Sequence, residues 1–170
     1  VSAGILTLTQ AIGVIMGANI GTTMTAWIVS IFGFSADIAS LAVPLMAVGF
    51  LLSISKRGRM RNIGEAVVGF CLLFIGLSFM KNAIPDLGHN PEAMAFISNF
   101  SGKGVFSVLF FVTVGTLLTI VLQSSSATVA LTLIFLNMGY IEFEMAAAMV
   151  LGENIGTTIT ANIAASMGNV

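Results

Sequence analysis

The chain alternates between long apolar runs and short polar interruptions. Residues 1–36 and 104–141 contain no Asp, Glu, Lys or Arg. Each of these stretches is longer than the ~20 apolar residues that cross a bilayer. A soluble helix of this length would need a charged outer face, which is missing here. The pattern therefore predicts an all-α integral membrane protein with apolar helical runs at residues 11–34, 38–55, 66–80, 104–122, 127–138 and from 145 onward.

Two of the polar interruptions are almost the same string. GANIGTTMTA at residues 17–26 and GENIGTTITA at residues 152–161 match at eight of ten positions. Internal similarity of this kind indicates two related structural units. We expect a first transporter repeat at residues 1–80 and a second at residues 81–170. Only the second copy holds an acidic residue, Glu153, where the first has Ala18.

The basic residues set the expected orientation. Lys56, Arg57, Arg59 and Arg61 lie together, so the positive-inside rule places the loop 56–62 in the cytoplasm. The polar connection 81–103, with a short surface helix near residues 92–100, then lies outside. One helix over 104–138 would be about 50 Å long, beyond the ~30 Å core, so a re-entrant helical hairpin is favoured.

With that hairpin, the two repeated strings cross the membrane in opposite directions. This is an inverted-topology repeat, an architecture of secondary transporters. The expected location is the cell membrane, as a multi-pass protein, which in a bacterium means the inner membrane. Gly17, Gly21, Gly152 and Gly156 are expected to break their helices and free backbone groups for ions.

The remaining chemistry-bearing residues exclude several classes of protein. A single cysteine, Cys71, excludes an intrachain disulfide, and His89 has no partners for a metal or catalytic site. The apolar segments show no Ser–His or Asp–Asp arrangement, so an enzyme is not expected. The net charge of −1 gives no indication of a nucleic-acid partner. Isolated hydroxyl residues are read as helix–helix packing, whereas adjacent and repeated ones are candidate ligands.

Glu153 has three readings. An intramembrane carboxylate is costly and is by default a functional residue. It would ligate a cation, carry a proton, or lie near the interface with little role.

The string QSSS at residues 123–126, followed by GENIGTT, resembles the repeat unit of the type II sodium–phosphate cotransporters and their bacterial relatives. In that family both half-repeats carry a QSSS string and a G-x-N-I-G-T string. The resemblance implies sodium-coupled symport of inorganic phosphate by alternating access, with sodium as the coupling ion and no other cofactor. It implies sodium at Gln123, Ser124, Thr157 and Thr158. The full set of expected substrate- and ion-binding residues is Gln123, Ser124, Ser125, Ser126, Asn19, Thr22, Thr23, Asn154, Thr157, Thr158 and Glu153.

One departure from the family pattern concerns the first repeat. Gln123 precedes Gly152 by 29 residues, and the same spacing before Gly17 falls upstream of Val1. We therefore expect the first repeat to lack its QSSS hairpin. Two alternatives stay open: a proton-coupled transporter of phosphate or another oxyanion, and a non-transporting membrane regulatory module. Expected partners are phosphate, sodium and the lipid bilayer, and a homo-oligomer remains open.

Overall fold

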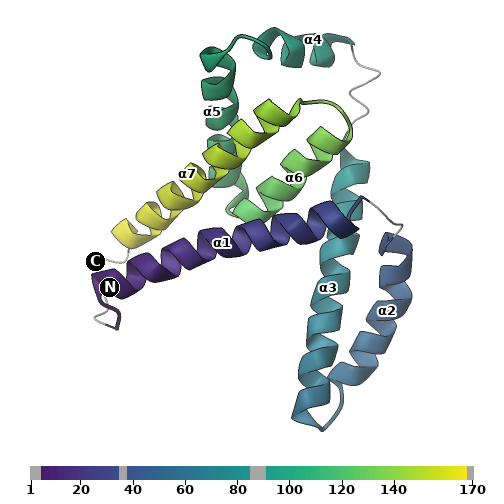
Figure 1. The fold of residues 1–170 in the computed structure, drawn as a ribbon. Helices are drawn as coiled ribbons and strands as arrows, with labels where there is room; N and C mark the ends of the chain where they lie inside the picture. Colours follow the sequence, from purple (N-terminus) through teal and green to yellow (C-terminus); the bar gives the residue numbers. More distant parts are fainter. Residues whose placement is uncertain (1–4, 35–37, 85–90, 168–170) are drawn as a thin grey trace. The chain divides into compact units, whose positions relative to one another are not determined.

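The computed structural model describes residues 5–34, 38–84 and 91–167, and within these ranges the regular structure is entirely α-helical (Figure 1). This confirms the predicted all-α class. Three of the helices, α1, α3 and α5, are long and apolar enough to cross a membrane. The helices are α1 Leu8–Phe32, α2 Ile38–Ser53, α3 Gly58–Ala83, α4 Pro91–Phe100, α5 Val105–Leu122, α6 Ser125–Asn137 and α7 Phe143–Met167.

The chain forms two compact units. One is Ile28–Pro85, and the other combines Val1–Trp27 with Asp86–Val170. This division follows packing, whereas the predicted division at residue 80 follows the sequence repeat. The repeat boundaries therefore remain a prediction.

In the first of these units α2 packs against α3. A side chain at Gly64 would collide with the Ser53 amide, so the two backbones touch near the turn. The basic cluster was expected to be a loop, but α3 begins at Gly58 and includes Arg59 and Arg61. Arginine is a good helix former, and Arg61 Nε lies 3.7 Å from Glu65 Oε1 one turn away. The helix expected at residues 66–80 therefore extends further at both ends, from Gly58 to Ala83.

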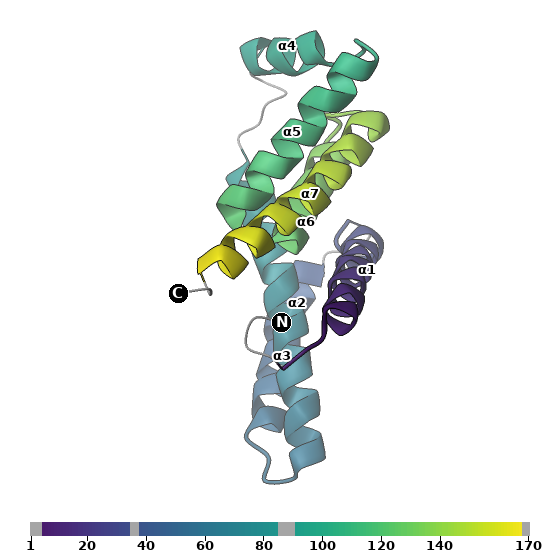
Figure 2. The same cartoon turned by 90° about the vertical axis from the view of Figure 1, so that its left-hand side faces the viewer.

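In the other unit α5, α6 and α7 lie side by side, as Figures 1 and 2 show. A side chain at Gly115 would meet the Met149 carbonyl, and one at Gly152 would meet the Val112 carbonyl. The Thr116 hydroxyl donates across the same contact to the Gly152 carbonyl at 2.9 Å. Small residues thus let α5 and α7 approach at backbone distance.

The expected helix breaks at the two repeated strings are wrong. Both α1 and α7 continue as α-helix through them. In the first copy the hydroxyls of Thr22 and Thr23 donate to the carbonyls of Ala18 and Asn19, four residues back. Thr157 and Thr158 do the same to Glu153 and Asn154. The threonines bond within an intact helix, and the glycines of α7 provide close packing instead of a break.

Candidate functional site

The QSSS string forms the turn between α5 and α6. Gln123 is the only described non-glycine residue with a positive φ, 56°, and its amide N–H donates to the Thr119 carbonyl at 2.8 Å. The left-handed conformation costs a non-glycine residue about 1–2 kcal/mol. The Gln123 side-chain amide donates to the Ile120 carbonyl at 2.6 Å. The chain therefore folds back here, as expected, although the re-entrant path relative to a membrane remains a prediction.

Ser124 caps the N-terminus of α6. Its hydroxyl accepts a hydrogen bond from the Ala127 amide at 3.3 Å. Ser125 and Ser126 occupy the first turn of α6 and are half-buried, whereas Gln123 and Ser124 are exposed. α6 has 13 residues, about 20 Å of helix, so it is shorter than the ~30 Å core of a bilayer.

One contact joins the first repeated string to this turn. The hydroxyl oxygens of Thr22 on α1 and Ser125 on α6 lie 3.3 Å apart, within hydrogen-bonding distance. The two residues are 103 positions apart in the chain. Asn19, half-buried, and Thr23, exposed, flank Thr22 on α1. The structure thus brings together two of the predicted elements, the first string and QSSS.

The second string is placed differently. Thr157 and Asn154 are half-buried and Thr158 is exposed, and the hydroxyls of both threonines bond to carbonyls of α7. These bonds do not connect α7 with the QSSS turn. A sodium site shared by Gln123, Ser124, Thr157 and Thr158 is therefore still a prediction.

Glu153 is fully buried between helices. The Thr132 hydroxyl of α6 donates to Glu153 Oε1 at 2.7 Å, and Glu153 Oε2 has no hydrogen-bond partner. The burial fits a functional carboxyl, and all three readings of Glu153 stay predictions.

The sequence interpretation missed three buried hydroxyl residues of α5 and α6, one of which, Thr132, donates to this carboxyl. Thr132, Thr128 and Thr119 are buried, and the Thr128 hydroxyl donates to the Ser124 carbonyl at 2.9 Å. A signal was available, because Ser124, Thr128 and Thr132 recur every four residues in an apolar run. That spacing puts them on one face of a helix.

The charge around the site is low. Helices α5, α6 and α7 carry no Lys or Arg, and their only acidic residues are Glu144 and Glu153. Within the described part of the chain, no three His, Cys, Asp or Glu side chains gather as metal ligands would. An anion bound here would be held by hydroxyls, amides and helix N-termini.

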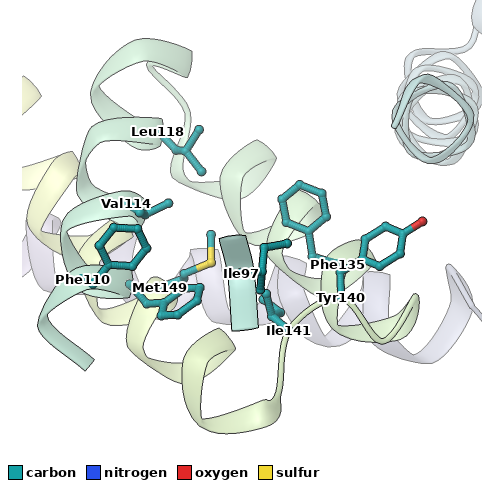
Figure 3. A pocket seen from close by; sticks show the side chains of 9 residues that line it. Ile97, Phe110, Val114, Leu118, Phe135, Tyr140, Ile141 and Met149 are labelled. Carbon is teal, nitrogen blue, oxygen red and sulfur yellow. The ribbon is translucent and has the colours of Figure 1, made fainter. Parts of the chain in front are cut away.

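The same unit contains an apolar pocket of about 160 Å³ (Figure 3). Residues from α4, α5, α6 and α7 line it, among them Ile97, Phe111, Phe135 and Met149. The Tyr140 hydroxyl points away from the other lining side chains in Figure 3. With an apolar lining this pocket does not suit an ion or a phosphate.

Comparison with known proteins gives several relatives. "Uncharacterized protein YqeW" of Bacillus subtilis is 29% identical over 99% of this chain and 52% of the relative. "Putative inorganic phosphate export protein YjbB" is 25% identical in Salmonella typhimurium and 24% in Escherichia coli K12, over 99% of this chain and 30% of each relative. The chain thus spans about half or less of the length of these relatives. No solved structure matches it.

A family model also matches nearly the whole chain. The model is described as "Na+/Pi-cotransporter", and it matches residues 1–82 and 92–169. The match includes both repeated strings and the QSSS turn between α5 and α6. The chain therefore belongs to the Na+/Pi-cotransporter family.

Proposed function

We propose that this protein carries inorganic phosphate across the cell membrane in symport with sodium, by alternating access. The family is one of phosphate transporters, which fits the apolar helices α1, α3 and α5. The observation that supports this site is the contact between Thr22 and Ser125, because it joins the first repeated string to the QSSS string. The oxyanion would bind at this contact.

The start of α6 suits an oxyanion. The first N–H groups of a helix lack partners within it, and the helix dipole adds partial positive charge there. The hydroxyls of Ser125 and Thr22 lie at the same end of α6. No basic side chain is present on α5, α6 or α7, so the charge of phosphate needs a co-bound cation. That need gives a physical reason for coupling to sodium, for which Gln123, Ser124, Thr157 and Thr158 are the proposed ligands.

Proton coupling is the second candidate, because Glu153 is a buried carboxyl on α7. The relatives named YjbB are described as phosphate export proteins, so the direction of net transport is tested together with the coupling ion. In a symporter the sodium and phosphate gradients together set that direction.

The test is phosphate flux in proteoliposomes that contain the full protein. We expect an inward sodium gradient to drive phosphate uptake, and an outward gradient to drive its release. If the flux depends on a pH gradient and not on sodium, the coupling ion is the proton and not sodium. No flux under any gradient would favour the non-transporting module.

A matched pair of variants locates the site. We expect Ser125→Ala to lower sodium-driven uptake several-fold, because it removes the hydroxyl that faces Thr22. Ser166→Ala is the control, since Ser166 is exposed and its hydroxyl donates only to the Ile163 carbonyl of its own helix. Equal uptake by both variants would argue against the site at the QSSS turn.

A further inference from the structure

The apolar pocket of Figure 3 reaches from the core of its unit to the surface. Of the described residues that line it, Phe111, Ile141 and Met149 are buried, and the others are half-buried. Its volume is about 160 Å³. An apolar cavity of about 150 Å³ stays free of water and binds benzene. The pocket therefore has room for a slender apolar group and an opening through which that group can enter.

The lining suits neither a polar ligand nor another helix. The described lining presents no polar atom to the pocket, and the Tyr140 hydroxyl points away from the other side chains (Figure 3). Helices that pack inside membranes meet through Gly, Ala, Ser and Thr, as α5 and α7 do at Gly115 and Gly152. None of the described lining residues is of these four types. Large branched and aromatic side chains leave an irregular space, which a flexible chain fills better than a helix.

A basic side chain lies next to the pocket. Phe110, which lines it, stacks on Phe100 with the ring centroids 4.1 Å apart. Lys103 Nζ lies 5.9 Å from the centroid of the Phe100 ring. The Lys103 amide donates to the buried Ser107 hydroxyl at 2.8 Å, which holds the backbone of this residue at the start of α5. Lys103 is exposed, so its positive charge is at the surface beside an apolar pocket.

Helix α4 shows at which level of a membrane this combination lies. Ile97 and Phe100 pack against the apolar core of the unit, whereas Glu92 and Asn99 are exposed. α4 runs across the bundle at the end where α5 begins (Figures 1 and 2). Amphipathic helices of this kind lie at the boundary between lipid headgroups and acyl chains. We therefore expect Lys103 at the level of the headgroups and the pocket at the level of the acyl chains.

We propose that the pocket holds one acyl chain of a membrane phospholipid, whose phosphate group lies against Lys103. An acyl chain is slender, flexible and free of hydrogen-bonding groups, as the lining requires. The phosphate is complementary in charge to the lysine ammonium group. The bound chain would fill the space between α4 and the helices α5, α6 and α7. This lipid site does not depend on the proposed transport of inorganic phosphate.

The experiment measures lipid binding to the purified full protein by native mass spectrometry. Dioleoyl phosphatidylglycerol is titrated into the detergent solution, and dioleoylglycerol, which lacks the phosphate headgroup, is titrated in parallel. We expect saturable binding of phosphatidylglycerol. The wild type should bind it about fivefold more tightly than dioleoylglycerol, which is the contribution expected of one lysine near a lipid headgroup.

Matched variants separate the pocket from the general lipid surface. Leu118→Trp fills the pocket and should weaken phosphatidylglycerol binding about tenfold or more. Leu117→Trp is the control, because Leu117 is the neighbouring residue on α5 but is 56% exposed and does not line the pocket. Lys103→Gln should remove the preference for phosphatidylglycerol over dioleoylglycerol. Lys81→Gln, exposed in the last turn of α3, removes one positive charge elsewhere and should keep that preference.

A second measurement uses the wild type, so it does not depend on the folding of a variant. The full protein is placed in nanodiscs with a phosphatidylglycerol that carries a photoreactive diazirine near the end of one acyl chain. After illumination, the labelled residues are identified by mass spectrometry. Met149 is only 2% exposed, so lipid of the surrounding bilayer does not reach it, whereas a chain in the pocket does. We expect label on Met149 and none on Cys71, which is buried in α3 away from the pocket lining.

Three results would overturn the proposal. Equal affinities of Leu118→Trp and Leu117→Trp would show that the lipid does not bind in the pocket. Absence of label on Met149 would show that no acyl chain enters it, as when another part of the protein closes the opening. Equal binding of phosphatidylglycerol and dioleoylglycerol by the wild type would remove Lys103 from the site. None of these results bears on phosphate transport, which is judged by flux.

Discussion

The two copies of the repeated string have nearly the same sequence but different surroundings. In α7, Gly152 and Gly156 are buried, and any side chain there would collide with α5. In α1, Gly17 and Gly21 are exposed, and an added Cβ would meet nothing within 4 Å. The threonine hydroxyls, however, bond backward in the same way in both copies.

The comparison shows that the threonines and the glycines of the string have different roles. Its threonines determine a local hydrogen-bond pattern, which both copies show regardless of their neighbours. Its glycines only permit close packing, which occurs where a partner helix is present. The glutamate belongs to the packed copy, where Thr132 of α6 binds it. The string thus acts as a packing surface in α7 and as an open face in α1.

The strongest test of this comparison is to add a methyl group to each copy. We expect Gly152→Ala to destabilise the protein by about 3 kcal/mol, because the new Cβ collides with the Val112 carbonyl. Gly17→Ala should be neutral or stabilising by up to about 1 kcal/mol, because alanine is the better helix former. Reversible denaturation in detergent measures both. Equal losses of stability would show that α1 is packed as tightly as α7.

A smaller effect is expected from the polar contacts of each copy. Thr132→Val leaves both oxygens of Glu153 without a partner and should cost about 2 kcal/mol. Thr22→Val removes a half-exposed 3.3 Å contact to Ser125 and should change stability by less than about 0.5 kcal/mol. Thr132→Ser is the control that keeps the hydroxyl. A loss for Thr22→Val as large as that for Thr132→Val would contradict the comparison.

The smallest effect concerns the feature that the copies share. Thr23→Ala and Thr158→Ala each remove an exposed hydroxyl that donates to a carbonyl of its own helix. Both should alter the free energy of unfolding by less than about 0.5 kcal/mol. The same denaturation experiment compares them. A clear difference between the two would show that one threonine has a partner beyond its own helix.

Much of the fold follows from the sequence alone, because helix positions depend on apolar length. The turn at residues 123–126 was also predictable, since one helix across residues 104–138 would exceed the bilayer. The sequence could not show whether the glycines break their helix or pack against a neighbouring helix, because glycine is suited to both. Only the presence of Val112 opposite Gly152 decides between them.

For the candidate site, the sequence indicated which residues to consider but not all of their contacts. Thr22 and Ser125, both in the predicted set of ligands, lie within hydrogen-bonding distance, whereas their binding of an ion or substrate stays a prediction. The partner of Glu153 could not be predicted, since Thr132 lies 21 residues away in an apolar run and reaches the carboxyl only through the pairing of α6 with α7. Long-range contacts of this kind depend on how the helices pair.

The backbone contact between α5 and α7 has a mechanical consequence. Thr116 donates to a carbonyl of each helix, at Val112 and at Gly152, and the glycines leave no space for sliding. We therefore expect α5 and α7 to keep their contact as one rigid pair in any change of conformation. The connections that join this pair to α6 run through Gln123 and Gly139, both with a positive φ.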